Sequence, residues 1–180
     1  MIRKTLYVVA ALLLAVVLAC GAALWYARPS ERLDLAYEPV SVAQKVVDMV
    51  KVRKPELTIS EKELNDILKK ELAKRAQVRP DVTIEGARFE QRANRVTAYV
   101  NVKAAGRVEV GAAVDFALEW KPPNLIVRPE ETRIRSLRIP ASWLPLEPIV
   151  VRVDESLPPP IGIRDIRFEP RQIVVSLKLS

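Results

Sequence analysis

The sequence predicts an α+β protein in which an N-terminal transmembrane helix precedes an antiparallel β-sheet and one long amphipathic helix. Three observations predict this class: residues 5–27 are uncharged and apolar, apolar residues recur at helical spacing over residues 60–77, and every even position from 96 to 120 is apolar or glycine. We expect residues 1–28 to be a transmembrane signal anchor, residues 29–54 a linker with a short helix, and residues 55–180 an extracytoplasmic α+β domain.

The N-terminal apolar run is long enough to cross a bilayer. Residues 5–27 would form a helix about 35 Å long at about 1.5 Å per residue, and the hydrocarbon core of a bilayer is about 30 Å thick. Arg3 and Lys4 precede the run, as in export signals, and Trp25 and Tyr26 end it, where interfacial aromatic residues are common. We therefore expect a single-pass protein of the cell membrane with its domain on the extracytoplasmic side.

The fate of this segment is open between three alternatives. An uncleaved anchor is the favoured interpretation, because the apolar run continues for seven residues beyond Cys20. Lipidation of Cys20 is the second alternative, since the small residue Ala19 precedes this cysteine. Simple secretion is the third and would require cleavage near residues 19–22.

Two helices are predicted after the anchor and a polar linker at residues 29–39. Residues 40–53 form a short amphipathic helix, which either packs on the domain or extends the anchor as a stalk. Residues 60–77 form a longer helix, because Ser60 and Glu63 make a capping box at its start. The apolar stripe of this longer helix consists of Leu64, Ile67, Leu68 and Leu72.

The alternating region predicts a β-hairpin with one buried face and one solvated face. A single strand over residues 96–120 would be about 80 Å long at about 3.3 Å per residue, whereas a domain of this size is about 40 Å across. The chain must therefore turn back. A three-residue turn at residues 105–107 keeps the even positions on one face, and Gly106 tolerates the left-handed conformation that it needs. We expect strands at residues 94–104 and 108–121.

The remainder of the chain is predicted to be mainly β-structure, punctuated by proline. The expected elements are a turn at residues 121–124, a short strand at 125–127 ended by Pro129, a strand at 132–139 with a bulge, the start of a short helix at 140–144, and a terminal hairpin of residues 163–169 and 173–179. In the last strand the apolar residues Ile173, Val175, Leu177 and Leu179 occupy alternate positions, so one of its faces should be buried.

Composition excludes several classes of function. The chain has no His, so Ser-His-Asp triads, Cys-His pairs and His-based zinc sites are impossible. The net charge is +7, but the basic residues are interleaved with acidic ones and form no stripe with stacking aromatic residues. We therefore expect no nucleic-acid partner. We also expect no enzyme activity, catalytic residue, metal or cofactor, because the sequence has no nucleophile elbow, phosphate-binding glycine loop or metal-spaced ligand set.

Three stretches carry a resemblance to a known family. They are LTISEKELNDIL at residues 57–68, RIPASWLP at 138–145, and LPPPIGIRDIRFEPRQIVVSLKL at 157–179. Together with the apolar N-terminal run, they resemble the YpmS-like family of membrane-anchored bacterial proteins and, less closely, the TULIP-like lipid-binding domains of the bacterial cell envelope. This resemblance implies that the antiparallel sheet is curved and wraps the long amphipathic helix, with an apolar groove for a lipid.

The buried sheet face mixes large and small side chains, which leaves volume for either a covering helix or a ligand. A closed core and a lipid-binding groove are therefore the two alternatives. The expected groove-lining residues are Leu64, Ile67, Leu68, Leu72, Val100, Val102, Val110, Ala112, Val114, Phe116, Leu118 and Trp120.

Two functions follow as hypotheses from this organisation. In the first, a membrane-anchored extracytoplasmic module binds or transfers a lipid or another amphiphile in the apolar groove. In the second, the chain is a ligand-free envelope scaffold or protein-interaction module. The expected partners are a membrane, a lipid ligand and an envelope protein.

Overall fold

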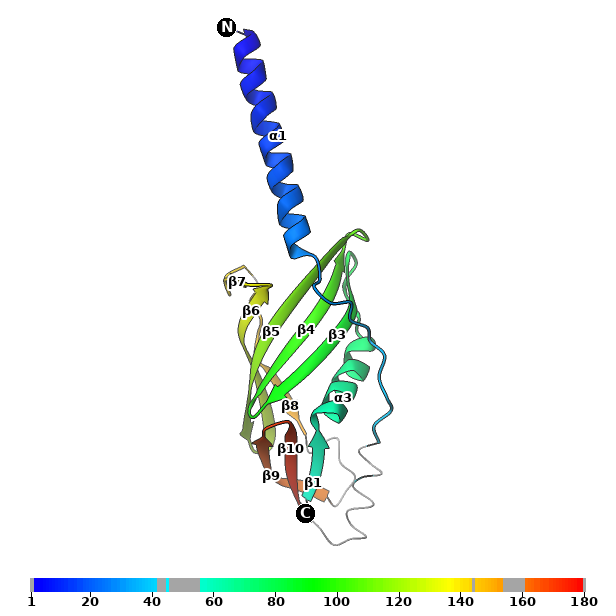
Figure 1. Ribbon diagram of the computed structural model, residues 1–180. Helices are drawn as coiled ribbons and strands as arrows, with labels where there is room; N and C mark the ends of the chain where they lie inside the picture. Colours follow the sequence, from blue (N-terminus) through cyan, green and yellow to red (C-terminus); the bar gives the residue numbers. More distant parts are fainter. Residues whose placement is uncertain (1, 42–44, 46–55, 144, 154–160, 180) are drawn as a thin grey trace.

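The computed structural model of the chain describes residues 2–41, 45, 56–143, 145–153 and 161–179, of which residues 2–11 and 179 are described without side chains. Within these residues the helices are α1 (Ile2–Ala27) and α3 (Glu61–Ala73). The strands are β1 (Glu56–Ser60), β2 (Gln77–Arg79), β3 (Val82–Arg92), β4 (Arg95–Ala104), β5 (Val108–Lys121), β6 (Asn124–Ile134), β7 (Leu137–Ile139), β8 (Ile149–Arg152), β9 (Ile161–Glu169) and β10 (Gln172–Leu179). The molecule is elongated, with α1 projecting from one end and the C-terminus at the other (Figure 1).

The described strands form two antiparallel sheets. The larger sheet has the order β2-β3-β4-β5-β6-β7, and β8 also pairs with β6. The smaller sheet has the order β1-β10-β9 and lies at the end of the larger sheet that is remote from α1 (Figure 1). Buried side chains from both sheets form the core of the described chain: Leu57, Val96, Leu118, Ile163, Ile166, Ile173, Val175 and Leu177.

The register of β4 and β5 confirms the predicted alternation. Val102 lies opposite Val110 and the pairing is continuous, so the even-numbered side chains of both strands share one face. We call this the apolar face and the opposite one the polar face. The strands cover residues 95–104 and 108–121, close to the predicted bounds, and Gly106 in the connecting turn has the expected positive φ of 66°.

The predicted α+β class, with a curved sheet wrapped on a long amphipathic helix, is wrong. Strands dominate the described chain, and α3 has only 13 residues, which is about 20 Å at about 1.5 Å per residue. α3 lies along the edge of β3 beyond the short pairing with β2, and there Asn65 Oδ1 accepts a hydrogen bond from the Phe89 N–H at 2.9 Å. Glu61 Oε1 accepts a second one from the Gln91 N–H at 3.1 Å. The helix thus satisfies backbone groups of a sheet edge, and the smaller sheet covers part of the apolar face instead.

The predicted membrane anchor is also corrected by the structure. The apolar run lies within α1, but no helix among the described residues is long and apolar enough to cross a membrane. This finding overturns the transmembrane signal anchor and the single-pass, extracytoplasmic localisation.

The strand β6 differs from the prediction in two places. It runs through Pro129, where the sequence indicated a break, because the register to β5 shifts between Asp115 and Phe116. Such a bulge accommodates a proline, which has no N–H to give to the ladder. The bulge predicted within residues 132–139 is instead a tight turn, in which Arg135 has a φ of 53° before β7 pairs back with β6.

Other predicted elements have mixed outcomes. The terminal hairpin of β9 and β10 is confirmed, and so is the capping box that begins α3. The helix start expected at residues 140–144 is a single turn, in which the Trp143 N–H donates to the Pro140 carbonyl at 2.9 Å, and residue 144 lies outside the described residues. Most of the short helix predicted at residues 40–53 also lies outside them.

Candidate functional site

The structure divides the predicted groove-lining residues into two groups. The first group belongs to a closed core: Leu118 is buried, and Leu64, Leu68 and Trp120 pack against the core cluster. Phe116 lies next to this group on β5, opposite the buried Val96. The remaining helical positions, Ile67 and Leu72, are half-buried on α3. Leu64, Leu68, Leu118 and Trp120 therefore belong to the core, and for Phe116, Ile67 and Leu72 the groove stays a prediction.

The second group lies on the apolar face beyond the smaller sheet. β3, β4 and β5 continue toward the end of the sheet that lies next to the C-terminal end of α1, while β1, β9 and β10 do not reach that end (Figure 1). The side chains of this region are half-buried, and we call them the open strip: Ile84, Val100, Val102, Val108, Val110, Ala112 and Val114. Five of these seven residues were predicted as groove-lining.

A run of exposed apolar side chains lies at the far side of β6. Trp143 is 77% exposed, and further large apolar residues of β7, β8 and their connection are also exposed: Leu137, Leu146, Ile149, Val150 and Val151. Beside them, a cleft of about 340 Å³ is lined in part by Ile139, Pro140 and Leu146. Exposed apolar side chains in such number are typical of a binding surface.

On the polar face, the segment after α1 crosses the larger sheet. The Asn101 side chain donates to the Glu31 carbonyl at 2.8 Å, and the Ala87 N–H donates to the Asp34 carbonyl at 3.1 Å. Residues 28–34, which we call the crossing segment, run from the end of α1 over β4 and β3 (Figure 1). Side chains would obstruct this path, and the sheet has Gly111 under Pro29 and Gly86 under the Leu33 carbonyl.

The end of α1 is held by the turn between β6 and β7. The Tyr26 hydroxyl hydrogen-bonds to Ser136 Oγ at 2.7 Å. The Arg135 guanidinium lies 5.3 Å from the ring centre of Tyr26 and 6.0 Å from that of Trp25, within the range of a cation–π interaction. Arg135 also donates to the carbonyl of Arg28 at 3.4 Å. The direction in which the crossing segment leaves α1 is therefore set by this turn.

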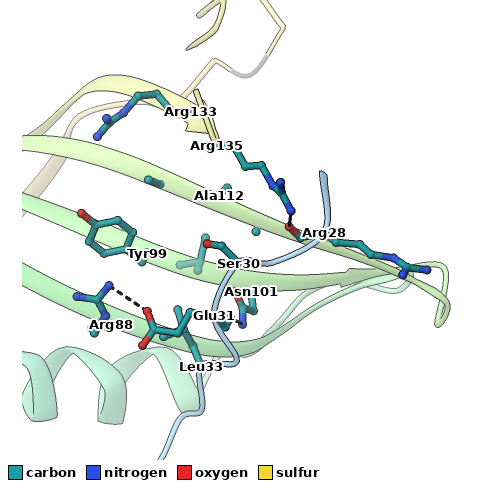
Figure 2. A pocket seen from close by; sticks show the side chains of 13 residues that line it. Arg28, Ser30, Glu31, Leu33, Arg88, Tyr99, Asn101, Ala112, Arg133 and Arg135 are labelled. Carbon is teal, nitrogen blue, oxygen red and sulfur yellow. Dashed lines mark hydrogen bonds and ion pairs between the residues drawn. The ribbon is translucent and has the colours of Figure 1, made fainter. Parts of the chain in front are cut away.

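A pocket of about 240 Å³ lies between the crossing segment and the strands beneath it (Figure 2). We call it the arginine pocket, because four arginines and a single carboxylate, Glu31, contribute to its lining. The arginines are Arg28, Arg88, Arg133 and Arg135. Ser30, Tyr99 and Ala113 also line this pocket.

Strand register explains how this pocket forms. Arg88 of β3 lies opposite Tyr99 of β4, Tyr99 opposite Ala113 of β5, and Ala113 opposite Arg133 of β6. These four side chains form one row across the polar face, and the small Ala113 leaves a gap in it. The bulge between Ile84 and Gly86 brings Arg88 onto this face.

Carboxylates of the adjacent row partner two of the arginines. Arg133 Nη2 lies 2.8 Å from Asp115 Oδ2, and Arg88 Nη1 pairs with Glu90. Arg88 also lies 4.4 Å from the ring centre of Tyr99 and 3.2 Å from Glu31. Burial alone would lower the pKa of Arg88, but its bonds to these two glutamates raise the pKa above its ordinary value.

Sequence reasoning missed the arginine pocket. The odd positions of 96–120 were read only as a solvated face, although Tyr99 and Asn101 are less typical of a purely charged surface. The path of residues 28–34 over the sheet depends on contacts between positions about 70 residues apart, which periodicity does not reveal. The glycines at positions 86 and 111 were the available signal, because a glycine inside a strand often marks a close backbone approach.

The remaining site predictions are untested. Cys20 is exposed on α1, and its lipidation stays a prediction. Among the described residues no group of His, Cys, Asp or Glu is arranged to hold a metal ion. The expectations of no enzyme activity and no cofactor stay predictions as well.

Comparison with known proteins gives no match for this chain. No family model matches it, and no curated protein or solved structure is significantly similar to it. The resemblance to the YpmS-like family and to TULIP-like domains therefore stays a prediction, and the function is argued from the site alone.

Proposed function

We propose that the chain is a non-catalytic binding module for an amphiphile, whose hydrocarbon part lies on the open strip. The observation that carries this proposal is the incomplete cover of the apolar face. The smaller sheet buries Val96 and Leu118 at one end, while Val100 and Val110 farther along the same strands are only half-buried. Apolar surface that folding leaves in water is favourable to bury on an apolar ligand.

The size of the open strip favours an amphiphile over a protein partner. From Val108 to Val114 the strip is about 20 Å long at about 3.4 Å per residue, and its outer strands are about 10 Å apart. This area, on the order of 200–300 Å², is well below the roughly 800 Å² per partner of a stable protein interface. A long, narrow apolar surface suits an extended acyl chain.

The test is binding of a fluorescent fatty acid, cis-parinaric acid, to the full chain, with oleate as competitor. We expect saturable binding that Val110→Asn weakens at least tenfold, because a polar amide would then lie under the hydrocarbon chain. The matched control is Glu109→Asn, which puts the same side chain on the polar face of the same strand and should change affinity less than twofold.

A second variant keeps the test decisive if Val110→Asn does not fold. Ala112→Phe retains an apolar surface but fills the middle of the open strip, and it should reduce binding at least fivefold. Absence of saturable binding to the folded wild-type chain, or equal losses in Glu109→Asn and Val110→Asn, would overturn the proposal.

A second candidate function, self-association through an extended edge, is favoured by β8. Its residues Ile149, Val150 and Val151 are 55%, 58% and 40% exposed, and among the described strands β8 pairs only with β6. Exposed apolar edge strands pair readily with another strand. If β8 joins two copies, sedimentation of the wild-type chain should give a dimer that Val150→Lys converts to a monomer; a wild-type monomer at all concentrations would exclude it.

A further inference from the structure

We propose that the arginine pocket binds a phosphate-type oxyanion carried by a small ligand or by a lipid headgroup. The site lies on the polar face of the larger sheet, opposite the open strip, so it is independent of the proposed function. The pocket of about 240 Å³ has room for a phosphate group and the atoms attached to it.

The charge of the lining favours an anion. Four arginines and one glutamate line the pocket. The carboxylates that pair with Arg88 and Arg133 from within the sheet are Glu90, Asp115 and Glu131; they belong to the neighbouring row and do not line the pocket. Arg135 has no carboxylate partner among the described residues, although its guanidinium reaches the edge of the pocket (Figure 2).

The uncharged donors of the pocket point to a tetrahedral anion. The hydroxyls of Tyr99 and Ser30 have no hydrogen-bond partner among the described residues, and both residues line the pocket. They come from β4 and from the crossing segment, whereas Arg133 comes from β6 and Arg135 from the turn between β6 and β7. A phosphate has several acceptor oxygens that can meet donors from different sides, whereas a carboxylate has only two oxygens in one plane.

Small residues provide the space for such a group. Ala113 lies between Tyr99 and Arg133 in the row across the sheet. Gly111 lies two residues away on β5, on the same face and opposite Asn101. A large side chain at position 113 would fill the gap without changing any charge. A substitution at position 113 therefore tests whether anion binding needs the space in the pocket, independently of its charge.

The test is isothermal titration calorimetry of the full chain at constant ionic strength, with inorganic phosphate and glycerol 3-phosphate as probes and glycerol as the uncharged control. We expect saturable binding of both phosphates and none of glycerol. Arg135→Gln should weaken phosphate binding about tenfold, since a charge-assisted hydrogen bond contributes about 1.5–3 kcal/mol. Ala113→Leu should reduce it at least as much by occupying the gap.

The matched control is Arg138→Gln, because Arg138 also carries a charge near β6 but pairs with Glu131 and does not line the pocket. This variant should bind phosphate within twofold of the wild type. No saturable phosphate binding, or an equal loss in Arg138→Gln, would overturn the proposal. So would unchanged binding in Ala113→Leu.

A further arm distinguishes the two sources of the phosphate. Soluble dihexanoyl phosphatidic acid is titrated into the same proteins. Tighter binding than glycerol 3-phosphate, lost in Arg135→Gln, assigns the site to a lipid headgroup, and equal or weaker binding assigns it to a free phosphorylated compound. To separate this site from the open strip, Val110→Asn should leave phosphate binding unchanged.

Discussion

At the scale of single residues, Glu63 has two roles at the start of α3. Its Oε2 accepts a hydrogen bond from the Ser60 N–H at 3.0 Å, which completes the capping box, and its Oε1 lies 2.5 Å from Lys45 Nζ. Burial alone would raise the pKa of Glu63, but the bonds from Lys45 and Ser60 outweigh this effect and hold the pKa below the ordinary value of 4.5.

This lowered pKa predicts how stability depends on acid. Because the folded state holds the proton less tightly than the unfolded chain, the contribution of Glu63 is fully present above pH about 4.5 and is lost as the pH falls through the folded-state pKa. Glu63→Gln retains a hydrogen-bond acceptor but does not titrate. We expect the free energy of unfolding, measured in urea, to fall less between pH 7 and pH 3 in Glu63→Gln than in the wild type, by up to about 1 kcal/mol.

The control for this prediction is Glu109→Gln, an exposed glutamate on β5 that makes no cap. It should follow the pH dependence of the wild type. A Glu63→Gln variant with the same loss between pH 7 and pH 3 as the wild type would contradict the assigned role.

Residue-scale features differ in how far the sequence predicts them. The cap follows from Ser60 and Glu63 alone, because both partners lie within one helical turn. The buried Gln91 was not predicted, since its Nε2 donates to the carbonyls of Ala93 at 2.6 Å and of Glu169 at 2.8 Å, and the second of these lies 78 residues away. Gln91 stands between the charged residues Glu90 and Arg92, and nothing in this local sequence indicates such a distant partner.

At the scale of elements, the crossing segment depends on the two glycines under it. A Cβ atom at Gly111 would lie 2.8 Å from Pro29 Cα, a distance at which the backbone must move. Gly111→Val should therefore displace the crossing segment while leaving the sheet formed. Limited proteolysis with trypsin should then cleave after Arg32 at least fivefold faster than in the wild type.

Ala117→Val is the matched control, because position 117 lies on the same face of β5 at its other end. It should leave the cleavage rate after Arg32 unchanged. Equal rates in Gly111→Val and the wild type would mean that the segment does not rest on this glycine.

Individual elements were predictable where the pattern is local. The strands β4 and β5 and their turn follow from an uninterrupted alternation of 25 residues and from Gly106. The position of α3 was not predictable, because its stripe of leucines indicates only that one face is buried. The free N–H groups of Phe89 and Gln91 place it at the edge of β3, and these become visible only once the sheet order is known.

At the scale of the whole molecule, the two sheets share one core and should unfold together. Ile163 of β9 is 3% exposed in a cluster that includes Val96 and Leu118 of the larger sheet. Ile163→Ala should lower the free energy of unfolding by about 2–4 kcal/mol, measured in urea. Fluorescence and circular dichroism should report the same single transition.

Ile149→Ala removes the same atoms from a side chain that is 55% exposed on β8 and should cost less than about 0.5 kcal/mol. Separate transitions for the two probes in the wild type would contradict a shared core, and so would equal costs of the two substitutions.

The global arrangement was the least predictable level. The periodicity of 96–120 indicates that one sheet face is buried but not what buries it. The prediction that a long helix covers this face is wrong, because β1 pairs with the hairpin of β9 and β10 to form a second layer. About 100 residues separate Ser60 at the end of β1 from Ile161 at the start of β9. For the same reason only part of the predicted groove became core.

The crossing segment joins α1 to the sheet and also forms one wall of the arginine pocket. A pull or a tilt applied to α1 would reach that wall directly through Arg28, whose carbonyl is bonded to Arg135. By thermodynamic reciprocity, an occupant that tightens the wall must restrict the orientations of α1 by the same free energy. The range of orientations that α1 adopts would then depend on whether the pocket is filled.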